Sequence, residues 1–173
     1  MITISVEDYN QISQDYYESI INSLQFHRLT CSCGHSSCLT IHGYYLRGIY
    51  LPDQILLLKV CRVKCSECGC THALLLSSIV PYSRIKASEQ HAIIIAYETA
   101  SGIGSVCDGN PSIDEKTAGS IVRRYIRFWK QRLLSERIST SKLETLIHSC
   151  FSHYSMQFMQ IRCTSNQLFL YPT

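Results

Sequence analysis

Cysteines are the residues of this chain best suited to chemistry, because it has ten and most of them lie between residues 31 and 70. Within that span, the run Cys65-Ser66-Glu67-Cys68-Gly69 has the spacing of a zinc knuckle. In a knuckle, a tight turn lets two thiolates bind one ion, and the glycine permits the backbone to bend. The run therefore predicts half of a tetrahedral metal site, with Cys65 and Cys68 as ligands.

The other half of the site is expected just upstream, where three thiols and an imidazole lie close together: Cys31, Cys33, Cys38 and His35. Their Cys-x-Cys-x4-Cys spacing departs from the usual Cys-x-x-Cys. We favour Cys33 with Cys38 and keep Cys31 as the close alternative, ahead of His35 and His42. The predicted ion is a structural Zn²⁺, because a small hairpin has little apolar core and would depend on metal to fold.

The alternative interpretation is that these cysteines are reduced thiols packed in a core, as free cysteines commonly are. Cys61 and Cys70 fit either the core or the surroundings of the metal. The remaining cysteines lack paired spacing and are interpreted as core: Cys107, Cys150 and Cys163. A disulfide scaffold is disfavoured, since such scaffolds are typically short and secreted.

Catalytic motifs are missing from the sequence. Zinc deaminases use His-x-Glu followed by Pro-Cys-x-x-Cys, and neither half of that pattern occurs. The sequence also contains no phosphate-binding Walker loop, no nucleophile elbow and no His-Glu-x-x-His helix. We therefore expect a protein that is not an enzyme.

The elements that would position the thiols are short and β-rich. Two apolar runs, 39–50 and 55–63, are separated by Pro52-Asp53, which predicts a hairpin between the two cysteine groups. Before them, an amphipathic helix is predicted over residues 6–26, where apolar side chains recur every four residues.

Helices are predicted after Pro81, over residues 87–100 and 103–108. Beyond Gly109-Asn110-Pro111, the run from Ser112 to Glu115 has the form of a capping box, so a long helix should start there and reach about Leu134. A last amphipathic helix is predicted over residues 142–159. This order of elements is typical of a helix-turn-helix, in which a helix and a short helix are followed by a break and a longer basic helix.

The long helix has a cationic face opposite an apolar one. Together with basic residues on the predicted strands, it gives the candidate nucleic-acid-binding set: Arg47, Arg62, Lys64, Arg123, Arg124, Arg127 and Lys130. The alternative is an ordinary solvated face paired with nearby acids. The net charge of +3 supports a polyanionic partner only weakly, and the segment 1–27 carries acids but no Lys or Arg.

These patterns together predict an α+β protein: a small β zinc ribbon followed by a mainly α-helical, helix-turn-helix-like bundle. The expected segments are an N-terminal amphipathic helix (1–28), the zinc ribbon (29–80), the helix-turn-helix-like region (81–137) and a C-terminal helix and tail (138–173). No apolar stretch is long enough to span a membrane and no signal peptide is recognisable, so we expect a cytoplasmic protein without a membrane partner.

Three runs carry a resemblance: residues 42–47, residues 62–69 and residues 71–75, the last reading Thr-His-Ala-Leu-Leu. They resemble the N-terminal zinc ribbon of bacterial insertion-sequence transposases, most closely a family of small stand-alone transposase-like proteins of Gram-positive bacteria. The similarity extends through residues 80–83 and 129–133 toward residues 160–173. In those transposases, ribbon and helix-turn-helix recognise element ends, and a later domain holds three metal-binding carboxylates.

The resemblance and the basic helix together favour a zinc-ribbon, DNA-binding regulator of a mobile element, or a transposase-derived accessory protein without the catalytic domain. Its expected partner is double-stranded DNA, and the apolar stripe over residues 142–159 is a candidate seam for a homodimer. The alternative is a protein-binding inhibitor or adaptor that acts on a host or phage nucleic-acid-binding protein.

Overall fold

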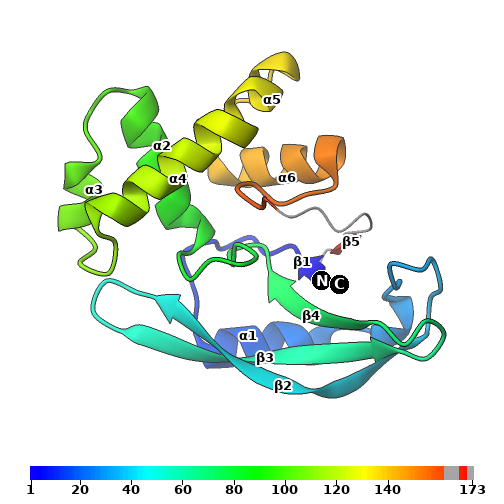
Figure 1. Cartoon of the computed structure of the whole chain (residues 1–173). Helices are drawn as coiled ribbons and strands as arrows, with labels where there is room; N and C mark the ends of the chain where they lie inside the picture. Colours follow the sequence, from blue (N-terminus) through cyan, green and yellow to red (C-terminus); the bar gives the residue numbers. More distant parts are fainter. Residues whose placement is uncertain (162–167, 171–173) are drawn as a thin grey trace.

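A long antiparallel hairpin is the main β element of the structure, a computed structural model that describes residues 1–161 and 168–170 (Figure 1). Strand β2 (Leu39–Tyr50) pairs with β3 (Ile55–Cys65) from Leu39 opposite Cys65 to Tyr50 opposite Ile55. The register shifts between Ile41 and Gly43, where a β-bulge lies. This hairpin confirms the predicted pair of strands, and the fold is α+β as expected.

The sheet extends beyond the hairpin. Strand β4 (Thr71–Leu76) runs antiparallel to β3, and two three-residue strands, β1 (Ile2–Ile4) and β5 (Leu168–Leu170), complete the order β2-β3-β4-β1-β5. Strand β1 pairs in parallel with both β4 and β5. The sequence did not predict β1 or β5, because three residues are too few to show alternation.

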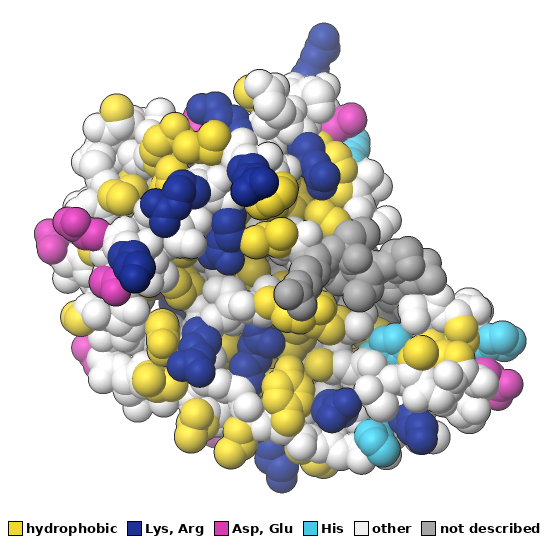
Figure 2. Space-filling view, in the orientation of Figure 1, with side chains coloured by type: hydrophobic (Ala, Val, Ile, Leu, Met, Phe, Trp, Pro, Cys, Tyr) yellow, Lys and Arg dark blue, Asp and Glu magenta, His cyan; other side chains and the backbone are white. Residues whose placement is uncertain are grey.

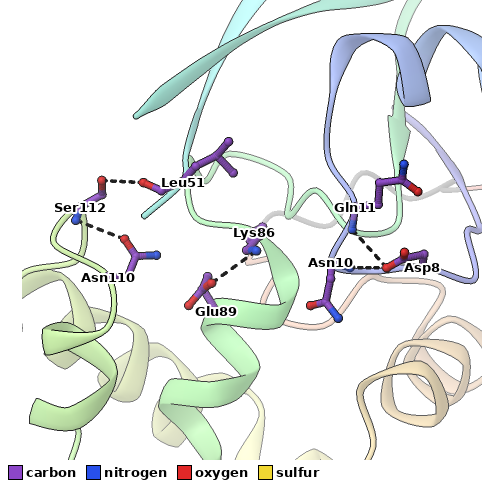
Figure 3. Close-up of polar contacts among 8 residues, drawn as sticks. All are labelled: Asp8, Asn10, Gln11, Leu51, Lys86, Glu89, Asn110 and Ser112. Carbon is purple, nitrogen blue, oxygen red and sulfur yellow. Dashed lines mark hydrogen bonds and ion pairs between the residues drawn. The ribbon is translucent and has the colours of Figure 1, made fainter. Parts of the chain in front are cut away.

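Helix α1 (Gln14–Ser23) is shorter than the helix predicted over residues 6–26. It begins where the Ser13 hydroxyl accepts a hydrogen bond from the Tyr16 backbone N–H at 3.1 Å. Upstream, Asp8 Oδ1 accepts from the backbone N–H groups of Asn10 and Gln11 in an Asx-type turn, and residues 6–13 are not helical (Figure 3). A short 3₁₀ helix, η1 (Phe26–Arg28), follows.

The predicted capping box is wrong. Helix α4 (Glu115–Phe128) is capped by Asp114, whose carboxylate accepts from the Thr117 backbone N–H at 2.6 Å. The Ser112 hydroxyl instead donates to the Leu51 carbonyl at 2.9 Å, which ties the loop before α4 to the end of β2 (Figure 3). The Ser112 side chain therefore forms a tertiary hydrogen bond instead of the helix cap that the local pattern predicted.

Three of the remaining helices follow the predicted order: α2 (Ala87–Glu98), α3 (Gly104–Asp108) and α6 (Leu143–Tyr154). Helix α5 (Lys130–Ser135) was not predicted as a separate helix. The long helix predicted to reach Leu134 is interrupted at Trp129, whose buried indole packs edge-on against Tyr154 and Phe158. Helix α6 ends at Tyr154, earlier than predicted, because Ser155 is left-handed with φ of 52°.

Two clusters of buried side chains hold these elements together. One lies between the sheet and α1, and the other among α2 to α6. Helices α2, α3 and α4 lie over the turn end of the hairpin, and the cysteine-bearing loops lie at its opposite end (Figure 1). None of the described helices is long and apolar enough to cross a bilayer. Cys163 and the end of the predicted C-terminal tail lie outside the described residues.

Candidate metal centre and basic surface

The hairpin brings the two cysteine groups together. Because Leu39 pairs with Cys65, the loop before β2 and the loop after β3 leave the sheet side by side. The Ser66 N–H donates to the Cys38 carbonyl at 2.8 Å and fixes one loop to the other. A contact between segments far apart in sequence is thus set by the register of a single strand pair.

Four thiols converge at this end of the hairpin: Cys31, Cys33, Cys65 and Cys68. Their sulfurs all lie within 4.8 Å of one another, and none of the four is in a disulfide. The Sγ atoms of Cys31 and Cys68 are 3.6 Å apart, and those of Cys33 and Cys65 are 3.8 Å apart. A tetrahedral zinc with Zn–S bonds of about 2.3 Å requires sulfurs about 3.8 Å apart. The four residues therefore fit a structural zinc site.

Tight turns hold each pair of thiols. Gly34, at φ of 91°, donates its N–H to the Cys31 carbonyl at 2.9 Å. In the second turn, Gly69 has φ of 71° and donates to the Cys65 carbonyl at 3.1 Å. The Cys68 backbone N–H lies 3.5 Å from Cys65 Sγ and lowers the pKa of that thiol to about 6. This lowered pKa favours the thiolate form of Cys65, which is the form that binds metal.

Cys38 lies outside the group of four, so the preference for Cys33 with Cys38 is corrected to Cys31 with Cys33. Burial raises the pKa of the Cys38 thiol to about 11, and its sulfur donates to the His35 carbonyl at 3.1 Å. Spacing could not decide this point, because both pairs are compatible with a turn.

His72 is a neighbour of the site that the sequence analysis missed. It is buried on β4, and its Nε2 lies 3.2 Å from Cys31 Sγ. Burial lowers the pKa of His72, so the ring is neutral and its Nε2–H can donate to the Cys31 sulfur. The other histidines play smaller parts: His35 Nδ1 lies 3.4 Å from Cys33 Sγ, and His42 is exposed outside the group.

No protein-family model, curated protein or solved structure significantly matches this chain. Cys31 and Cys65 are buried, whereas Cys33 and Cys68 are exposed, so the centre lies at the surface of the sheet. Four thiolates would complete the coordination of a zinc ion and leave no position for a substrate, which is the arrangement of structural zinc sites.

The predicted basic residues of the strands differ in role. The Arg47 Nη2 atom donates to the carbonyls of Val80 at 2.8 Å and Ser83 at 2.7 Å, so this guanidinium fixes the turn that leads into the helices. Arg62 donates to the Thr71 hydroxyl at 2.9 Å and is half-buried, whereas Lys64 is exposed. Of these three side chains, Lys64 has the most freedom to reach a ligand.

The predicted basic residues of the helices fall into two groups, which differ in exposure and in pairing with acids. Arg123 and Arg127 are exposed on α4 and have no acidic partner among the described residues. Arg124 is half-buried and Lys130 forms an ion pair with Glu98 at 3.0 Å. A further exposed cation, Lys116, lies on the same face of α4 as Arg123. Its spacing of seven residues from Arg123 was the signal that could have revealed it.

Proposed function

We propose that this chain is a nucleic-acid-binding protein that contacts duplex DNA through α4 and carries a structural zinc on its four clustered thiolates. The observation that carries the proposal is that Arg123 and Arg127 are exposed on one helix whose other face is buried, and that neither forms an ion pair among the described residues. Arginines on one exposed helical stripe can bind phosphates and can pair bidentately with guanine.

The surroundings of α4 support this proposal. Helices α2 and α3 pack against α4, as bracing helices do in a helix-turn-helix. Figure 2 shows Lys and Arg side chains spread among hydrophobic ones over one face, while Asp and Glu side chains lie toward its margins. Such a face attracts a polyanion even though the total charge is only +3. The origin in a mobile element rests on the sequence resemblance alone.

The test is a salt titration of binding to a fluorescent duplex, measured by anisotropy. The double variant Arg123→Ala/Arg127→Ala should bind more weakly, and the slope of log affinity against log salt should fall by about 1.8. The control, Arg28→Ala/Lys142→Ala, removes the same charge from two exposed positions outside α4. Absence of duplex binding at low salt, or equal losses in both double variants, would contradict the proposal.

A second candidate function, docking onto a protein, is favoured by an apolar patch on the hairpin. Five large apolar side chains of β2 and β3 are each more than half exposed, and four of them share one face of the hairpin: Tyr44, Leu46, Ile55 and Leu57. Large exposed apolar side chains that gather in one place mark interaction sites. Capture of one host protein after nuclease treatment, lost in Leu46→Ser/Leu57→Ser, would support this function; retention by the variant would exclude the patch.

A further inference from the structure

An apolar groove lies where α2 crosses α4. Its volume is about 560 Å³, and small residues, Ala96 and Gly119, leave the space open between the two helices. Ile103 and Val122 form apolar walls, and Tyr97 and Arg123 contribute the polar atoms. A groove of this size and lining falls within the range that small-molecule sites occupy.

Gly119 is the residue that keeps the groove open. It lies inside α4, where glycine is less favourable than alanine. A Cβ atom at this position would meet only the Nη1 atom of Arg123, at 3.4 Å, which is the end of a flexible side chain. Packing therefore does not require glycine here, although a side chain at this position would enter the groove.

The charges around the groove define what it can accept. Lys130 neutralises Glu98 at 3.0 Å and also lies over the Tyr97 ring. The Tyr97 ring is held edge-on to Tyr125, with the ring centroids 6.5 Å apart. Among the described residues, Arg123 is the charged side chain of the lining and has no acidic partner. An apolar floor beside one unpaired guanidinium complements a molecule with an apolar body and a single carboxylate.

We propose that this groove binds a small apolar carboxylate, an aromatic or medium-chain acid, whose carboxylate pairs with Arg123. Because Arg123 also belongs to the proposed DNA-contacting stripe, a bound acid removes one cation from that stripe and weakens DNA binding. The regulatory half of this inference rests on the proposed function, whereas the binding half does not.

The experiment uses 1-naphthoate and octanoate as probes, titrated into the full chain without DNA by calorimetry and ligand-observed NMR. Saturable binding is expected. Gly119→Leu should weaken it at least about 10-fold without lowering the melting temperature, because leucine fills the groove and favours the helix. Arg123→Gln should weaken it about 10-fold, because it removes a charged hydrogen-bond donor.

The matched control is Arg127→Gln, which removes an arginine one turn along α4 that does not line the groove. It should bind both probes like the wild type. A failure of both acids to saturate the chain at millimolar concentration, or wild-type binding by Gly119→Leu, would overturn the site.

A second arm repeats the duplex titration with saturating 1-naphthoate, which should weaken DNA binding by wild type but not by Arg123→Gln. Unchanged DNA affinity in the wild type would overturn the regulatory half. If the chain binds no duplex at all, the proposed function fails, and the probe titrations still decide whether the groove is a site.

Discussion

Replacing single cysteines by serine distinguishes the four clustered thiols from their neighbours. Cys31 and Cys68 belong to the group whose sulfurs lie within 4.8 Å of one another, whereas Cys38 donates its proton to the His35 carbonyl outside it. We expect Cys31→Ser and Cys68→Ser to lose zinc, and Cys38→Ser to keep it. Cys38→Ser is the matched control, because a serine hydroxyl can also donate to that carbonyl.

The magnitude follows from the number of ligands. Structural zinc binding in small peptides is worth about 10–16 kcal/mol at neutral pH, and four thiolates share it, so removal of one ligand should weaken binding at least about 100-fold. Cys68 is exposed, so its replacement tests ligation without disturbing a core, whereas Cys31 is buried beside His72. Agreement between the two variants would separate loss of metal from misfolding.

The assay is metal stoichiometry by mass spectrometry, with affinity measured against a chromophoric chelator. Removal of the metal from wild type should also speed hydrogen exchange in the loops 31–38 and 65–70, because the ion links them. The helical cluster is a separate core and should keep its protection. Two results would refute the reasoning: wild-type protein without stoichiometric metal that is insensitive to a chelator, or equal zinc loss in Cys38→Ser.

Three further changes test the fold around the sites. Tyr17→Phe should lower the free energy of unfolding by about 1–3 kcal/mol in urea, because Tyr17 Oη donates to Leu74 O at 2.9 Å and accepts from Cys61 N at 2.8 Å; an unchanged midpoint would contradict this. Gly119→Ala should raise the free energy of unfolding by about 0.5–1 kcal/mol, because alanine favours the helix. A lower melting temperature would show that the position is crowded. Ser112→Ala should lower the free energy of unfolding by about 0.5–1.5 kcal/mol, because the loop loses its hydrogen bond to Leu51, while hydrogen exchange in the first turn of α4 stays slow. Faster hydrogen exchange in that turn would show that Ser112 caps the helix after all.

Local patterns were sufficient to predict much of the scaffold. The bounds of β2, the start of β3 and the order of the helices agree with the alternation and turn signals of the sequence. The knuckle at Cys65 and Cys68 was also predictable, since its thiols and glycine lie within one turn. These features depend on interactions between residues that are close in sequence, which spacing reports directly.

Only the tertiary structure decided the contacts between distant segments. The pairing of Leu39 with Cys65 brings the loops together, but it does not by itself select Cys31 over Cys38, which are both buried; the positions of the side chains in the upstream turn do. The contacts of His72 and Arg47 were likewise decided by the tertiary structure. His72 reaches Cys31 from strand β4, and Arg47 donates to backbone carbonyls of a later turn. Sequence determines which side chains can bind metal, phosphate or backbone, and the fold decides which partners come within reach, because that depends on long-range register and packing.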